Sequence, residues 1–198
     1  MASELELKAV VHDVAALRTA LGRVGATRTF RGMMRDRRLD RGGELVALDQ
    51  RLRVRTYEPD AGNPRSELTW KGPSTVNEAG YKRSEEFECG AEDGAAALAI
   101  FRALGYEIVH ALDRFVEVWR HDDASARLEW YPRMDLLLEI EGTPEGIERL
   151  IVAIGFQRTD CLPDSLADFA ARFAARTRHR ALWAEADLSG AAPGWHDA

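Results

Sequence analysis

Charged and apolar residues alternate along several short stretches of this sequence, and this alternation constrains the fold more than any other feature. The first stretch is Glu4-Leu5-Glu6-Leu7-Lys8. Successive side chains on a β-strand point to opposite faces, so the charged residues share one face and the leucines share the other. Taken alone, this pattern is that of a surface strand with its charged face in water. Later stretches repeat it with complementary charges, and together they favour a shared charged surface.

The predicted elements follow an order that occurs twice, about 80 residues apart: a strand, a helix, a glycine and further strands. Strands are predicted at 3–11, 27–35, 44–57, 66–72, 81–89, 106–120, 125–131 and 134–142. Helices are predicted at 14–21, 92–104, 143–155 and 165–186 from their caps and apolar spacing. We therefore expect a single domain over residues 1–186. It would have pseudo-equivalent halves at about 1–72 and 81–142, C-terminal helices over 143–186, and a flexible tail at 187–198.

The charged faces of these strands carry both signs. The carboxylates are Glu4, Glu6, Glu129, Glu139 and Glu141, and the bases are Lys8, Arg53, Arg55, Lys71, Arg83 and Arg114. The positions between them are mostly apolar and must be buried against helices. If the sheet closes on itself, the charged faces line its lumen. The alternative is an open sheet with cross-strand salt bridges in water; the number of strands that carry the pattern favours the lumen.

A lumen with so many charges requires compensation, because burying unpaired charge is costly. Carboxylates that converge from different strands form a hard oxygen site of the kind that Mg²⁺ or Mn²⁺ prefers. Lysine and arginine side chains match the oxygens of a triphosphate, which arginine binds bidentately. The composition of the charged faces therefore points to phosphoryl or nucleotidyl chemistry, in which positioning and charge neutralisation dominate.

Composition excludes few classes of protein but narrows the choice of partner. The net charge of −6 argues against a general nucleic-acid binder, which needs a basic surface. No apolar run is long enough to span a membrane, and the N-terminus has no signal-peptide pattern. The two cysteines, Cys89 and Cys161, have no metal-binding spacing. We expect a cytoplasmic protein without membrane or nucleic-acid partners.

An ordered set of motifs resembles the CYTH superfamily, the triphosphate tunnel metalloenzymes. After Glu4-x-Glu6-x-Lys8 come the segments 52–55 (LRVR), 68–73 (LTWKGP), 82–86 (KRSEE), 104–106 (LGY), 114–119 (RFVEVW), 138–142 (LEIEG) and 164–166 (DSL). Within the superfamily, the Lys-Gly-Pro strand and the Arg83-x-Glu85 step look most like bacterial class IV adenylate cyclases. The resemblance covers residues 4 to about 173.

This resemblance implies an α+β fold: an eight-stranded antiparallel barrel that closes into a tunnel, with helices packed outside. It implies metal ligands at Glu4, Glu6, Glu139 and Glu141, to which we add Glu129. It implies substrate contacts or catalytic roles for Lys8, Arg53, Arg55, Lys71, Arg83, Glu85 and Arg114. It also implies Mg²⁺ or Mn²⁺ as cofactor and a homodimer. The chain departs from the family in two places: Val116 stands where a second base is common, and Glu129 stands where aspartate is usual.

Three functions agree with these residues. The first is an adenylate cyclase that converts ATP to cyclic AMP and pyrophosphate. The second is a hydrolase of inorganic triphosphate or thiamine triphosphate, which would use almost the same side chains. The third is a module that binds nucleotide or polyphosphate without catalysis, which the loss of a base at Val116 favours. The sequence does not distinguish the two reactions, because it does not show where a nucleoside would lie.

Overall fold

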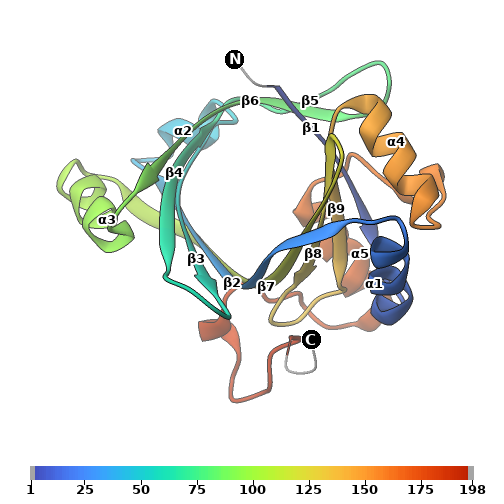
Figure 1. Ribbon diagram of the computed structural model, residues 1–198. Coiled ribbons are helices and arrows are strands. Elements are labelled where there is room, and N and C mark those ends of the chain that lie inside the picture. The colour runs from blue at the N-terminus through green and yellow to red at the C-terminus, as the bar shows by residue number, and fades with distance from the viewer. Residues whose placement is uncertain (1–2, 196–198) are drawn as a thin grey trace.

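Eight antiparallel strands close into a barrel in the computed structural model, which describes residues 3–195, with side chains from residue 5 onward (Figure 1). The strand order is β1-β9-β8-β7-β2-β3-β4-β6, and pairing of β6 with β1 closes the ring. A ninth strand, β5, pairs with β6 outside the ring. The strands are β1 Ser3–Val10, β2 Thr27–Asp40, β3 Arg51–Pro59, β4 Arg65–Lys71, β5 Thr75–Val76, β6 Lys82–Ala91, β7 Glu107–His121, β8 Ala124–Trp130 and β9 Leu137–Gly142. The predicted closed eight-stranded barrel is confirmed.

Five α-helices pack around the barrel, with α1, α4 and α5 on one side and α2 and α3 on the other (Figure 1). They are α1 Val14–Arg23, α2 Glu44–Ala47, α3 Gly94–Ala103, α4 Pro144–Ala153 and α5 Leu166–Thr177. Side chains at their N-termini cap them: the Asp13 carboxylate accepts from the Ala16 N–H, and Thr143 accepts from the Gly146 N–H. Within residues 3–195, no helix has the length and apolar character needed to cross a membrane.

The main hydrophobic core lies outside the barrel wall rather than inside it. Leu7 on β1 and Ile140 on β9 face outward and belong to the same buried cluster as Leu21 of α1 and Ile147 of α4. Each of these side chains is at most 1% exposed. Because the apolar faces of the strands are covered from outside by helices, the charged faces turn inward. The fold thereby places ionisable side chains in its centre.

The C-terminal segment differs from the predicted helix over 165–186. Helix α5 ends at Thr177, where Arg178 adopts a left-handed backbone conformation with φ 63°. The chain then turns back and Leu182 forms a bridge with Arg133, so that Trp183 reaches the lining of the barrel cavity. Further on, Gly194 donates a backbone hydrogen bond to Pro132. Contacts with residues distant in sequence hold the segment after Thr177, so the local spacing of apolar residues predicts a longer helix than the structure has.

The segment 44–57 also differs from its prediction as one strand. Its first residues form helix α2, and strand β3 begins only at Arg51. The Asp40 carboxylate accepts hydrogen bonds from the N–H groups of Leu45 and Val46, both at 3.1 Å, which satisfies the start of the helix. The two glycines before it, Gly42 and Gly43, have positive φ. The Asp40 side chain of β2 thus caps a short helix that the alternation of charged and apolar residues does not predict.

Candidate active site

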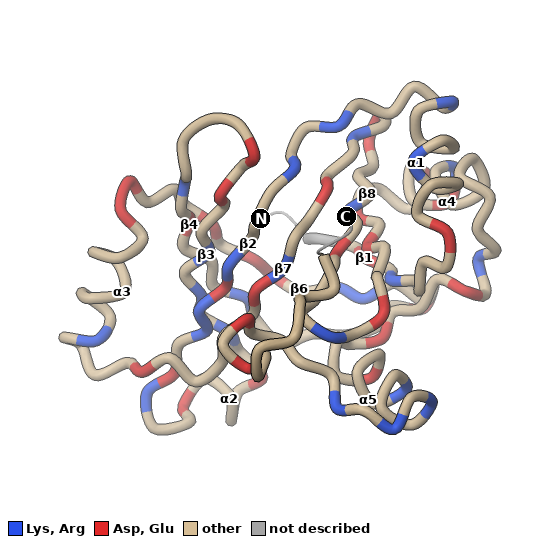
Figure 2. Tube along the Cα trace, turned by 90° about the horizontal axis from the view of Figure 1, so that it is seen from below, with Lys and Arg blue, Asp and Glu red and all other residues tan. Residues whose placement is uncertain are grey.

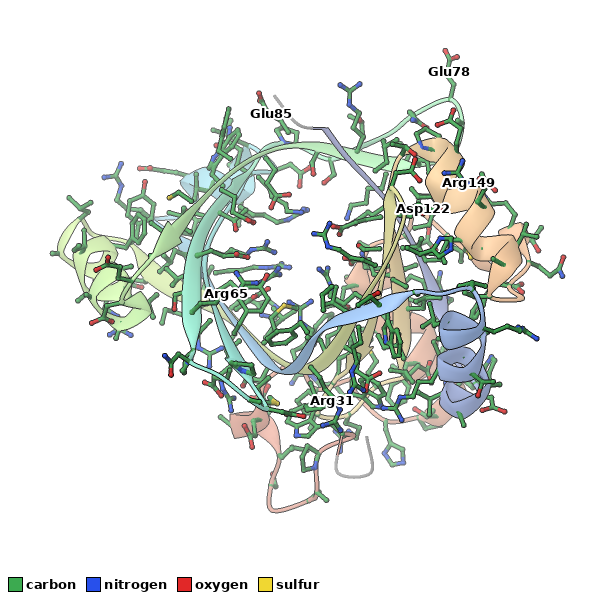
Figure 3. The ribbon with its side chains drawn as sticks, viewed as in Figure 1. Arg31, Arg65, Glu78, Glu85, Asp122 and Arg149 are labelled. Atoms are coloured by element: carbon green, nitrogen blue, oxygen red, sulfur yellow. The ribbon has the colours of Figure 1, made fainter. Side chains whose placement is uncertain are left out.

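Inward-facing side chains from all eight barrel strands surround a cavity of about 350 Å³ that opens beside α5. Figure 3 shows many nitrogen-tipped side chains that project into the ring, and Figure 2 shows basic and acidic positions interspersed along the strands. Of the side chains that the structure describes, nine cationic and four anionic ones line this cavity. The cations are Lys8, Arg38, Arg51, Arg53, Arg55, Lys71, Lys82, Arg114 and Arg127, and the anions are Glu6, Asp36, Glu129 and Glu139. Although the chain has a net charge of −6, its interior is cationic.

Asp36 on β2 connects three arginines at the centre of the tunnel. Its two carboxylate oxygens accept from Nε and an Nη of Arg55 at 2.6 and 2.8 Å and from Arg114 at 2.7 Å, and Arg53 lies at 3.8 Å. Asp36 is 1% exposed. Burial opposes its ionisation, but Arg55 and Arg114 outweigh burial and hold the pKa of Asp36 well below its usual range. The carboxylate is therefore a fixed negative charge that holds two guanidinium groups in place.

Glu129 on β8 forms a second buried ionic group. Its carboxylate accepts from Arg114 at 2.8 Å, from Arg127 at 2.9 Å and from the Tyr131 hydroxyl at 2.6 Å. Burial would raise the pKa of Glu129, yet Arg114 and Arg127 lower it to about 2. Burial beside this carboxylate also raises the pKa of Tyr131, which therefore remains a hydrogen-bond donor. Arg114 bridges the Asp36 and Glu129 groups.

The pKa of Glu129 predicts loss of stability in acid. Because its folded-state pKa is depressed, its contribution is complete above the unfolded value near 4.5 and disappears as the pH falls toward 2. We expect Glu129 to contribute about 3 kcal/mol that is lost in this window. Urea denaturation of the wild type and of Glu129→Gln at several pH values measures the difference, which should shrink as the pH falls. A difference that stays constant from pH 7 to pH 2 contradicts the ionic assignment.

The ammonium of Lys8 lies where two carboxylates converge. Lys8 Nζ contacts Glu6 at 3.1 Å and also contacts Glu139, which Arg127 contacts from its other side. Lys82 contacts Glu6 as well. Both glutamates, Glu6 and Glu139, are at most 9% exposed. The strands β1, β9 and β6 thereby place two glutamates and two lysines in one small region of the wall.

Two buried guanidinium N–H groups have no acceptor within the described residues: Nε of Arg53 and Nε of Arg114. Arg53 otherwise lies near Glu86, at 3.4 Å, which Lys71 also contacts at 2.9 Å. A buried donor without a partner costs free energy, so such groups mark positions where a ligand oxygen would be stabilised. Both unpaired donors belong to residues that line the cavity.

Most of the predicted site residues lie in the tunnel. Eight of them line the cavity: Lys8, Arg53, Arg55, Lys71, Arg114, Glu6, Glu129 and Glu139. Glu141 lies in the wider opening at the other end, which has a volume of about 1100 Å³ and shares Arg53, Arg55 and Arg127 with the cavity. The side chain of Glu4 lies outside the described part of the chain.

Arg83 and Glu85 require a correction, because both are exposed on the outer face of β6. Figure 3 shows Glu85 pointing away from the ring. The inward-facing residues of this strand are Lys82 and Glu86, since Lys82 pairs in register with Glu6. A shift of one residue moves every side chain of a strand to its other face. The sequence carries charges on both faces of 82–86, so alternation alone does not identify the inner one.

Several tunnel residues were absent from the predicted site, among them Asp36, Arg38, Arg51, Lys82, Glu86, Arg127 and Tyr131. Asp36 and Arg38 belong to the run 35–38 (RDRR), in which every position is charged and no apolar face is visible. Arg127 and Tyr131 alternate with the predicted Glu129, and this spacing was the signal that could have identified them. Val116, which stands where a second base is common in the family, has a packing role here. It is fully buried in a cluster with Met34, Tyr57 and Phe30.

The fold and the charged lumen define a tunnel of the kind that the resemblance to the CYTH superfamily predicts. No family model and no curated protein matches the chain. Solved structures do match it. A candidate adenylate cyclase from Vibrio parahaemolyticus has 16% identity and a TM-score of 0.71, with 85% of this chain and 97% of that chain covered. The PH1819 protein from Pyrococcus horikoshii OT3 has 20% identity and a TM-score of 0.69, with 85% and 98% covered.

A plant protein provides a third comparison. HpAC1 from Hippeastrum is a candidate adenylyl cyclase whose structure is described as revealing a dominant triphosphatase activity. It has 15% identity and a TM-score of 0.61, with 89% of this chain and 96% of that chain covered. At these identities the likeness shows the fold, and it confirms the fold that the sequence motifs predict. The reaction must be argued from the side chains.

Proposed function

We propose that this protein is an enzyme that binds the triphosphate group of its substrate in the tunnel and, with ATP, forms cyclic AMP and pyrophosphate. The observation that carries this proposal is the excess of five positive charges among the described side chains that line a cavity of about 350 Å³. A triphosphate brings a similar amount of negative charge, and arginine forks suit its oxygens. The unpaired Nε groups of Arg53 and Arg114 support the same ligand, because phosphate oxygens would accept from them.

The wider opening supports a substrate that carries a nucleoside. Arg53, Arg55 and Arg127 line both this opening and the cavity, so phosphates held by them would leave the adjoining space of about 1100 Å³ for an organic group. In the proposed reaction the ribose 3′-hydroxyl oxygen bonds to the α-phosphorus, and the bond from this phosphorus to the bridging oxygen breaks. Pyrophosphate leaves, and the hydroxyl proton is released to solvent. The tunnel cations stabilise the charge that grows on the departing oxygens.

We further propose that Glu6, Glu139 and Glu141 hold Mg²⁺ or Mn²⁺ together with the substrate. Their chemistry fits, because carboxylate oxygens are the ligands that these ions prefer. Glu6 pairs in register with Glu141, and both Glu6 and Glu139 contact Lys8, so their oxygens converge. The described residues contain no group of three acidic, histidine or cysteine side chains arranged for a metal. The carboxylates would therefore share the ion with phosphate oxygens, and the ion would supply additional positive charge beside the phosphates.

Hydrolysis of a triphosphate is the second candidate, and the likeness to HpAC1 favours it. One experiment separates the candidates: incubate the protein with Mg²⁺ or Mn²⁺ and either ATP or inorganic triphosphate, and identify the products by chromatography. Cyclic AMP with pyrophosphate supports the cyclase. Orthophosphate from inorganic triphosphate without cyclic nucleotide supports the hydrolase. Binding without turnover indicates a binding module, and absence of binding by folded protein refutes the tunnel as a triphosphate site.

Arg53→Ala is expected to weaken triphosphate binding about 10- to 100-fold, because it removes a charge-assisted contact to the phosphates. Arg53 is mostly buried and is only partly neutralised, by Glu86 at 3.4 Å and Asp36 at 3.8 Å. Calorimetric titration with inorganic triphosphate measures the affinity. Arg65→Ala is a matched control, since Arg65 is exposed and contacts Glu67 at the rim. Equal affinity of Arg53→Ala and wild type contradicts the proposed position of the phosphates.

A further inference from the structure

Arg38 differs from the other cations of the tunnel because its side chain has no partner among the described side chains. It lies on β2 two residues after Asp36, faces the same cavity and is opposite Arg53 and His110 in register. Its side chain makes no hydrogen bond and no ion pair with any residue whose side chain the structure describes. Asp36, which attracts it, already binds Arg55 and Arg114. Arg38 is therefore a cation whose charge the protein leaves uncompensated at short range.

The groups around Arg38 do not offset its positive charge. Burial and the neighbouring Arg51 lower the pKa of Arg38 to about 10, which leaves the guanidinium charged at neutral pH. Burial and Arg38 also lower the pKa of His110, so its imidazole is neutral at pH 7. Arg51 is held by Asp49 at 3.1 Å and by Ser74 at 3.3 Å. Such an arrangement is unfavourable for the folded protein alone and favourable for a protein that holds an anion there.

The N-terminus of α5 contributes to the lining of the same cavity. Ser165, Leu166 and Ala167 line it, and α5 has 12 residues. The first N–H groups of a helix have no partner within the helix and carry partial positive charge, which favours an anion. The Ser165 side chain satisfies the N–H of Asp168, one turn further on. The cavity that Arg38 lines from the barrel wall is thus also lined by the start of a helix.

We propose that Arg38 binds the terminal phosphoryl group of the triphosphate substrate, so that the free end of the phosphate chain points toward α5. The substituted end then points to the wider opening. This inference rests on the proposed function and adds the orientation of the substrate. A terminal phosphoryl group carries close to two negative charges at neutral pH, and an inner one carries a single charge. The cation without a carboxylate partner matches the group with the greater charge.

The test compares ATP with ADP, which lacks the terminal group. Calorimetric titration without metal measures the affinity of wild type, Arg38→Gln and Arg37→Gln for each nucleotide. Arg37 is the matched control, because it follows Asp36 on the outer face and contacts Asp113 at 2.9 Å. We expect Arg38→Gln to bind ATP about 10- to 100-fold more weakly and ADP within about twofold of wild type. Arg37→Gln should bind both nucleotides as wild type does.

A stability measurement distinguishes a ligand-binding residue from a structural one. Removing an uncompensated charge should raise the thermal midpoint of the unliganded protein, and we expect about 2–4 °C for Arg38→Gln. Arg38→Lys keeps the charge without the fork and should bind ATP with intermediate affinity. Equal weakening of ATP and ADP, or no change in either, overturns the proposed orientation even if wild type binds ATP. Failure of folded wild type to bind either nucleotide overturns the proposed function itself.

Discussion

Replacement of Asp36 by asparagine is expected to lower the free energy of unfolding by about 3–5 kcal/mol. The substitution keeps the shape of the side chain and removes only its charge. Arg55 and Arg114, which are 4% and 5% exposed, would then lose the carboxylate that both contact. Arg114 would keep Glu129, but Arg55 would lose its counter-charge, and an uncompensated buried cation is among the most damaging results of a single substitution. Since a domain of ordinary stability has about 5–15 kcal/mol, the loss is a large fraction of the total.

Urea denaturation measures this loss, with Glu58→Gln as the matched control. Glu58 accepts from Arg35 at 3.1 Å in a partly exposed pair, so its neutralisation should cost less than about 1 kcal/mol. Inorganic triphosphate should raise the thermal midpoint of Asp36→Asn more than that of wild type, because ligand oxygens replace part of the missing charge. An Asp36→Asn protein within 1 kcal/mol of wild type would show that the arginines do not depend on Asp36.

The sequence predicts the barrel best where one face of a strand is charged and the other is apolar. In β1 the leucines alternate with Glu6 and Lys8, and the structure buries Leu7 in the outer core while both charged side chains line the cavity. The same holds for β9, where Leu138 and Ile140 face outward and Glu139 faces inward. Burial of the apolar face fixes the orientation of such strands, so their charged residues can be placed without coordinates.

The prediction fails where both faces of a strand are charged. In β6, Lys82 lies inside the barrel and Arg83 lies outside. The inner face of this strand is determined by the pairing of Lys82 with Glu6, about 76 positions earlier in the chain. In β2, the same ambiguity hid Asp36 and Arg38, because outward-facing Arg37 finds its own partner in Asp113. A two-residue period in the sequence predicts which side chains of a strand share a face. When both faces are charged, only the register with strands distant in the sequence determines which face is the inner one.

Glu139→Gln is expected to reduce metal-dependent turnover about 10²- to 10³-fold while leaving metal-free triphosphate binding intact. If Glu139 is a metal ligand, the amide loses the negative charge that attracts Mg²⁺ or Mn²⁺. The same change frees Lys8 and Arg127 from a carboxylate that both contact, so the tunnel becomes more cationic and should bind triphosphate at least as tightly. The two effects have opposite signs, which separates a role in metal binding from a general loss of structure.

The measurement pairs initial rates over a range of metal concentrations with calorimetric titration of triphosphate in the absence of metal. Glu85→Gln is the control, because Glu85 is an exposed carboxylate on the outer face of β6. Wild-type turnover by Glu139→Gln at every metal concentration would remove Glu139 from the metal site. Loss of metal-free binding together with turnover would instead show that Glu139 acts by positioning Lys8 and Arg127. The metal ligands would then have to be sought at Glu6 and Glu141, which pair in register on β1 and β9.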